Sequence, residues 1–286
     1  MSFGETVLLG ALAGFTIFLG LPFARLQVLG TRSRVALSMF AVGVLAFLFV
    51  DVFEHAFAIV ETAVSGYKSG DNGLGKAVGL VALMGGGFAA GTAGLATVQR
   101  MIKPSGAIRP PVAGGSADAL PVDDAARLAA EADGARRRAL QTGMVIAAAI
   151  GLHNFAEGLA IGVSASTGEI GLATVLIVGF ALHNSTEGFG IVGPLGPVQP
   201  SWSWIALAGL VAGGPTFVGA MVGYNVTSEP LELAFYAVSG GAILFVVGEV
   251  WNAMRRFGHA ELGLWMLSAG FMVGIITDLV VVYGGG

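Results

Sequence analysis

The feature that most constrains this chain is a series of apolar stretches, each long enough to cross a lipid bilayer. A membrane-spanning helix needs about 20 consecutive, mostly apolar residues. Of the residues, 55% are hydrophobic and only 11% are charged, whereas soluble domains carry about 25% charged residues. We therefore predict an all-α integral membrane protein with eight transmembrane helices, at 5–25, 34–62, 76–99, 140–165, 169–191, 202–225, 232–254 and 261–283.

One long polar segment, 101–139, interrupts this series. It starts rich in Pro and Gly and ends in an Ala-rich charged run whose composition is compatible with a helix. We interpret it as a loop between the third and fourth helices. The predicted organisation is a single membrane domain, with helices 1–3 in 1–100, the loop in 101–139 and helices 4–8 in 140–286.

The distribution of positive charge predicts how the chain is oriented. Lys and Arg accumulate in the cytoplasmic connections of membrane proteins. With eight spans, twelve of the 14 Lys and Arg residues fall on one side, and only Lys68 and Lys76 fall on the other. We therefore predict that the long loop is cytoplasmic and that both termini are extracytoplasmic, in a multi-pass protein of the plasma (inner) membrane.

The residue types that are absent narrow the chemistry. There are no cysteines, so disulfides and thiolate sites are excluded, and any metal must be bound by His, carboxylate or amide groups. The sequence contains no P-loop pattern, no feature that supports nucleic-acid binding and nothing that suggests a prosthetic group.

A repeated motif contains the His, carboxylate and amide groups that could bind a metal. GLHNFAEGLAIG at 151–162 and ALHNSTEGFGIV at 181–192 share Leu-His-Asn-x-x-Glu-Gly. Within each copy, His and Glu are four residues apart and lie on the same face of a helix. Imidazole nitrogens and carboxylate oxygens are ligands for first-row transition metals, and amide oxygens can join them. The predicted metal ligands are His153, Asn154, Glu157, His183, Asn184 and Glu187.

A structural explanation of the same residues is interhelical hydrogen bonding without a ligand. Against it, a charged residue at mid-membrane costs about 2.5–3.5 kcal/mol on insertion scales. Within the predicted spans, Lys and Arg occur only at the ends. A bound cation is therefore the most economical counter-charge for the two glutamates.

Further acidic and His residues lie in other spans. They are Asp51, Glu54 and His55 in the second, Glu249 in the seventh and Asp278 in the eighth. They either line a metal pathway or make ordinary polar contacts between helices. Pro215 in the sixth span frees a backbone carbonyl and is expected to bend its helix.

These motifs resemble the ZIP family of zinc and iron transporters along the whole chain. The resemblance implies eight helices, extracytoplasmic termini, a long cytoplasmic loop after the third helix, and the two motifs as the central metal site. Family members often have Pro at the position of Ala156, Asp at that of Asn184 and Glu at that of Gly214. Because two acids are missing, we expect the site to bind one ion, where the fuller family motif would bind a close pair.

The expected function is transport of a divalent transition metal toward the cytoplasm by alternating access. Zinc is the first choice, with iron, manganese and cadmium as alternatives, and the metal is a substrate. A divalent ion that crosses about 100 mV gains about 4.6 kcal/mol, so neither ATP nor a coupling ion is required. No enzyme activity is expected.

The alternatives are an intramembrane metal-dependent hydrolase, which the lack of an HExxH motif disfavours, and a receptor or scaffold without flux. The expected partners are the metal ion and the lipid bilayer. The glycine-rich third span, with GGGFAAGTAG at 85–94, can pack closely within one chain or between two chains of a homodimer.

Overall fold

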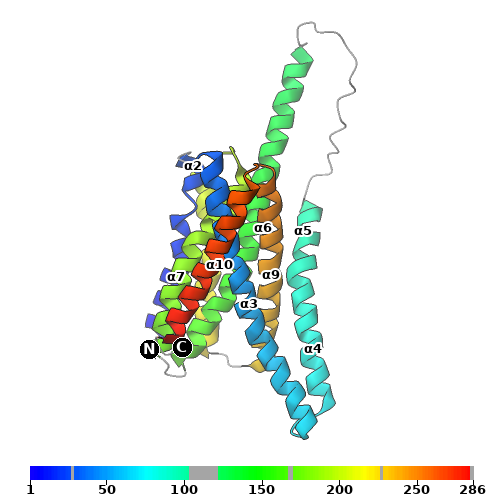
Figure 1. Cartoon of the computed structure of the whole chain (residues 1–286), viewed down its shortest axis with the longest axis vertical. Coiled ribbons are helices and arrows are strands. Elements are labelled where there is room, and N and C mark those ends of the chain that lie inside the picture. The colour runs from blue at the N-terminus through cyan, green and yellow to red at the C-terminus, as the bar shows by residue number, and fades with distance from the viewer. Residues whose placement is uncertain (27–28, 103–121, 167–169, 226–227, 284–286) are drawn as a thin grey trace.

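The computed structural model describes residues 1–26, 29–102, 122–166, 170–225 and 228–283, and all regular structure in these ranges is helical. Each of the eight predicted spans coincides with a helix or with a run of consecutive helices (Figure 1). The α-helices are α1 Phe3–Phe15, α2 Phe23–Leu26, α3 Thr31–Ser69, α4 Leu74–Ala89, α5 Leu95–Ile102, α6 Val122–Ser166, α7 Ile170–Val192, α8 Trp202–Asn225, α9 Glu229–Arg255 and α10 Ala260–Tyr283.

Length and composition support the membrane assignment. Within the described residues, seven helices or helix runs are long and apolar enough to cross a bilayer. α7, which is 23 residues long, occupies the place of the predicted fifth span.

The first span is not the continuous helix that we predicted. α1 ends at Phe15, a 3₁₀ turn covers Thr16–Leu19, and the short α2 follows. The hydroxyl of Thr16 lies 2.6 Å from the carbonyl oxygen of Ala13 and 2.7 Å from that of Ala181 on α7. Side-chain hydrogen bonds of this kind compete with the backbone hydrogen bonds of a helix. The first span is therefore interrupted where Thr16 contacts α7.

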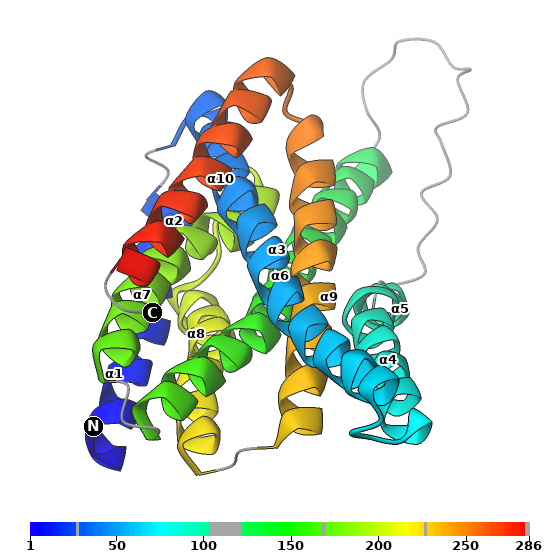
Figure 2. The ribbon, with the colours of Figure 1, turned by 60° about the horizontal axis from the view of Figure 1, so that its bottom comes forward.

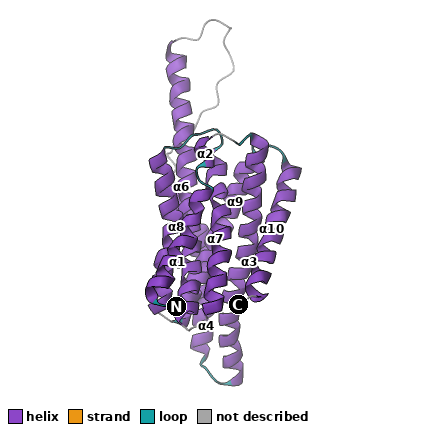
Figure 3. Cartoon of the chain, turned by 90° about the vertical axis from the view of Figure 1, so that its left-hand side faces the viewer, coloured by secondary structure: helices purple, strands orange, loops and turns teal. Residues whose placement is uncertain are grey.

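The polar segment also differs from a simple loop. Its residues 122–139 are helical and continue without interruption into the fourth span, so α6 is 45 residues long. Residues 103–121 lie outside the described ranges. At ~1.5 Å per residue, α6 is about 67 Å long, and its first turns extend beyond the bundle at the end opposite the start of α1 and the end of α10 (Figures 1 and 3).

The helices form two groups. α1, α6, α7 and α8 pack on one another as the first helix group, and α3, α4, α9 and α10 pack as the second (Figure 2). Small residues allow the closest contacts, as expected where packing drives association. A Cβ added at Gly158 of α6 would lie 2.1 Å from Thr216 O of α8, and one at Gly188 of α7 would lie 2.8 Å from Ile17 O. The motif glycines thus bring α6 and α7 against their neighbours in the same group.

The glycine-rich third span packs within the chain at two of its glycines. A π-helical turn, Ala90–Gly94, joins α4 to α5. A Cβ added at Gly87 would lie 2.9 Å from the Ala237 Cβ, and one at Gly91 would lie 2.2 Å from Val238 O, both on α9.

Candidate metal centre

The two motifs place their polar side chains in the interior of the bundle. Their helices run side by side, and each side chain on the inner face is almost fully removed from solvent. The exposed fractions are His153 1%, Asn154 0%, Glu157 4%, His183 6%, Asn184 0% and Glu187 0%.

His153 is the centre of the cluster. Its Nε2 lies 3.1 Å from Glu157 Oε1 on the same helix and 3.8 Å from Glu187 Oε1 on α7. Its other nitrogen, Nδ1, lies 3.0 Å from the hydroxyl of Ser239 on α9. One imidazole thus meets both motif carboxylates and a residue of the second helix group.

The two asparagines connect the motifs to two segments with irregular backbone, the turn of α8 near Pro215 and the break of the first span. Asn154 donates from Nδ2 to Glu187 Oε2 at 3.2 Å and to Ala212 O at 3.0 Å. Ala212 lies in the turn of α8 that Pro215 disturbs, because proline has no N–H and crowds the carbonyl four residues earlier. Asn184 donates to Ala13 O, at the break of the first span, at 3.2 Å.

Several polar atoms in this cluster make no hydrogen bond. They are Nε2 of His153, both ring nitrogens of His183, both carboxylate oxygens of Glu157, Oε1 of Glu187 and Oδ1 of both asparagines. Buried polar groups normally have a partner, so a concentration of unpartnered ones needs an explanation such as water or an ion. All but the His nitrogens are oxygen atoms that can only accept, and each neutral imidazole ring offers one lone pair. A cation is the ligand that satisfies such a set.

The cluster is not a finished coordination sphere. In the part of the chain that the structure describes, no three or more His, Asp and Glu side chains are arranged to hold a metal ion as they stand. Metal binding at the motifs therefore requires these side chains to rearrange around the ion.

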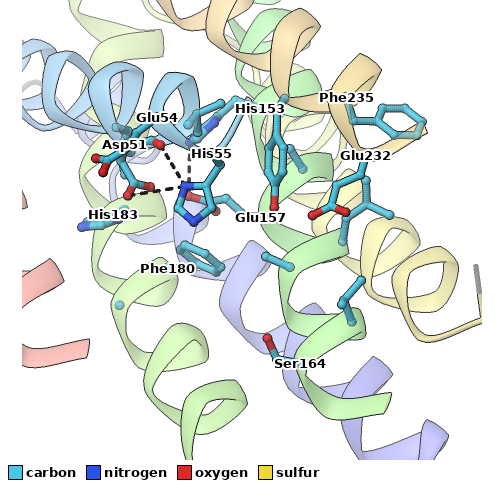
Figure 4. A pocket seen from close by; sticks show the side chains of 18 of the residues that line it. Asp51, Glu54, His55, His153, Glu157, Ser164, Phe180, His183, Glu232 and Phe235 are labelled. Atoms are coloured by element: carbon cyan, nitrogen blue, oxygen red, sulfur yellow. Dashed lines mark hydrogen bonds and ion pairs between the residues drawn. The ribbon is translucent and has the colours of Figure 1, made fainter. Parts of the chain in front are cut away.

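A cavity of about 530 Å³ leads to the cluster. It lies between the two helix groups, and its walls come from α3, α6, α7, α9 and α10 (Figure 4). His153, Glu157 and His183 lie on its wall. Ser164 near the end of α6, Ser228 before α9 and Asp278 near the end of α10 also line it. It therefore extends from the bundle end that holds the termini inward to the motifs.

Four of the five additional residues singled out in the sequence line this cavity: Asp51, Glu54, His55 and Asp278. Glu232 and Tyr236 on α9 also line the wall, and neither was predicted from the sequence. No Lys or Arg is among the described residues of the wall. The described lining thus combines five carboxylic acids and three histidines with no Lys or Arg, which favours cations.

His55 is held differently from His153. Its Nδ1 lies 2.9 Å from the backbone oxygen of Asp51 and 4.0 Å from that residue's Oδ1. Its side chain is 59% exposed, and its ring centre is 5.6 Å from that of Tyr236.

Glu249 is not brought to the cavity. It lies further along α9, where its Oε2 accepts a hydrogen bond from Gln99 Nε2 of α5 at 2.7 Å. The pair joins α5 to α9, so this carboxylate already has a protein partner.

Beyond the cluster, toward the end of α5 and the start of α6, the interior is apolar and closed. Buried side chains from four helices fill it: Met39, Val42, Ile146, Ile150, Ile191, Val246 and Val250. Among the described residues, the lining of the cavity therefore reaches one end of the bundle and not the other.

Ser239 is the site residue that sequence reasoning missed. No motif marks it, because a lone serine before two glycines is common in membrane helices. Its contact with His153 links positions 86 residues apart.

Comparison with known proteins agrees with these observations. Residues 121–248 match the family model described as ZIP Zinc transporter. The chain is 28% identical over 145 residues to Zinc transporter ZupT of Clostridium perfringens, a match that covers 49% of this chain and 50% of the relative. It is 29% identical over 131 residues to Zinc transporter ZIPB of Bordetella bronchiseptica, covering 44% of this chain and 42% of the relative. The chain thus spans about half the length, or less, of the curated relatives it matches.

Proposed function

We propose that this chain is a metal transporter of the ZIP family, whose model matches residues 121–248, and that it carries a divalent transition-metal cation, zinc foremost, across the membrane through the cavity between its two helix groups. The observation that supports this most is the buried cluster of His153, Glu157, His183 and Glu187, with its unpartnered acceptor atoms. The match to zinc transporters supports the choice of metal. The metal is cargo, and no step of its passage needs a reaction catalysed by the protein.

Charge supports a divalent cation over other solutes. Two buried glutamates at ~2.5–3.5 kcal/mol each are costly in a bilayer unless a positive charge compensates them. A dication neutralises both carboxylates at once, and neutral imidazoles complete its coordination. An anion or a neutral solute would leave the acids uncompensated.

The size of the cavity supports entry of a hydrated ion. A metal ion with six waters occupies roughly 200 Å³, from about 30 Å³ for each water, and the cavity measures about 530 Å³. A hydrated ion therefore fits as far as the motifs. Asp51, Glu54, His55 and Asp278 line that route, and the motif side chains replace the waters at its end.

The direction of transport follows from topology. The uneven distribution of Lys and Arg assigns the open end of the cavity to the extracytoplasmic side of the plasma membrane. The described conformation is then open outward and sealed toward the cytoplasm by apolar side chains. Alternating access requires that seal to part after the ion binds, and the membrane potential favours inward movement by about 4.6 kcal/mol at 100 mV.

The site binds one ion. Asn184 and Gly214 provide no charge where a second dication would need it, and two dications about 4 Å apart repel by at least ~4 kcal/mol even in water. The bound ion is held by His153, His183, Glu157 and Glu187, while Asn154 and Asn184 position these side chains or add an oxygen.

Metal accumulation in proteoliposomes tests the proposal. We expect His153→Ala, Glu157→Ala and His183→Ala each to abolish zinc uptake while the purified protein remains folded, and zinc titration of the wild type to give one equivalent. His259→Ala is a matched control, because His259 lies exposed in the connection between α9 and α10. Full uptake by the three cluster variants, or loss of uptake with His259→Ala, would show that the cluster is not the transport site.

A further inference from the structure

We infer that Ser239 is a positioning residue of the metal site, whose hydroxyl supports His153 both before and after the ion binds. The inference rests on the proposed function. It concerns a side chain of α9, in the second helix group, which no motif includes.

The contact is short and fully enclosed. Ser239 is 0% exposed and His153 is 1% exposed, and the hydroxyl oxygen lies 3.0 Å from Nδ1. Ser239 is therefore the enclosed partner that satisfies Nδ1.

The hydroxyl matters because His153 must exchange one tautomer for the other. A neutral imidazole has one N–H and one lone pair. Without a metal ion, Nε2 lies 3.1 Å from Glu157 Oε1 and 3.8 Å from Glu187 Oε1. Neither contact is aligned as a hydrogen bond, but the negative charge of two nearby carboxylates favours the N–H on Nε2. Nδ1 then has the lone pair and needs a donor, which the O–H of Ser239 provides.

Metal binding reverses these requirements. A metal at Nε2 takes the lone pair there, so the proton of the neutral ring must lie on Nδ1. Nδ1–H now needs an acceptor, and the oxygen of Ser239 provides it. A hydroxyl is both donor and acceptor, so the same side chain satisfies both tautomers.

His55 shows the contrast within the same cavity. Its Nδ1 lies 2.9 Å from a backbone oxygen of Asp51, which can only accept. That contact places the N–H on Nδ1 and leaves the lone pair on Nε2. Ser239 therefore gives His153 a freedom that His55 lacks.

Zinc binding to the purified full-length chain tests the inference. Loss of the partner that orients a metal-bound His typically weakens metal binding about 10- to 100-fold. We expect a loss of that size for Ser239→Ala and recovery for Ser239→Thr, which keeps the hydroxyl. Ser38→Ala is the matched control: Ser38 is 1% exposed and bridges α3 to Phe189 O of α7 at 3.2 Å, without touching a motif side chain. Ser38→Ala should bind zinc like the wild type.

Nitrogen NMR of the ring provides a readout that a merely structural serine would not change. The chain has only 4 histidines, so ¹⁵N-histidine labelling gives few signals, and His153→Ala identifies the one required. We expect the His153 proton on Nε2 in the metal-free wild type and on Nδ1 with zinc. A proton already on Nδ1 without metal, or unchanged affinity in Ser239→Ala, would overturn the inference. If His153→Ala itself binds zinc normally, the proposed metal site fails; if it does not bind while Ser239→Ala does, only the role of Ser239 fails.

Discussion

Replacing Glu187 with Gln should make the metal-free protein more stable and remove its response to zinc. Glu187 is 0% exposed, with Oε2 bonded to Asn154 Nδ2 at 3.2 Å and Oε1 3.8 Å from His153 Nε2. A glutamine of the same shape can keep its carbonyl oxygen toward Asn154. The substitution therefore removes charge and leaves packing and the hydrogen bond in place.

The substitution should raise the stability of the metal-free protein and remove the stabilisation by zinc, and the size of each effect can be worked out. Removing a buried carboxylate relieves up to ~2.5–3.5 kcal/mol in the metal-free state. Zinc at 100 times its dissociation constant stabilises the wild type by about 2.7 kcal/mol. For a chain of this size that corresponds to a rise of about 5–10 °C in the melting temperature, at ~2–4 °C for each kcal/mol.

Thermal unfolding in detergent, followed by fluorescence of the 4 tryptophans, measures both effects with a chelator and with zinc. Glu249→Gln is the control, since Glu249 also accepts from a single amide but lies away from the cavity, and it should keep the full zinc response. If Glu187→Gln melts below the wild type without metal, the carboxylate is structural. If it keeps the full zinc response, Glu187 is not a ligand. Either result would refute the reasoning.

Two other predictions concern packing and topology. Gly158→Ala should destabilise the protein by about 1–3 kcal/mol, as overpacking does, because the new Cβ would lie 2.1 Å from Thr216 O. Gly248→Ala is the control, because a Cβ there would have nothing within 4 Å, and it should not lower the melting temperature. Equal melting temperatures of the two variants would contradict the packing argument. In this cysteine-free chain, Ser2→Cys should react with a membrane-impermeant thiol reagent in intact cells and Ser116→Cys should not, and the reverse pattern would invert the topology.

The sequence was informative where one property recurs along the chain. Hydropathy located the spans, and the spacing of His153 and Glu157 predicted that they share a helix face, as their 3.1 Å contact bears out. Such features depend on residues that are close in sequence, so the period of the helix suffices to predict them.

What sequence reasoning missed depends on contacts between distant segments. The break at Thr16 depends on Ala181, 165 residues away. Asp278 and Glu249 looked alike as single acids in apolar helices, yet only Asp278 lines the cavity, because the direction that each helix faces is set by its neighbours.

The uninterrupted length of α6 has a practical consequence. This helix bears three of the motif side chains and continues as one rod from Val122 to Ser166, and the pair Arg127–Glu131, at 3.4 Å, lies on its outer turns. From His153 to the start of the helix is about 47 Å at ~1.5 Å per residue. A tilt of about 10° around the metal site would therefore sweep the far tip through about 8 Å if the rod stays stiff. A spectroscopic label on that tip would therefore report small movements at the centre of the bilayer as larger displacements that can be measured in water.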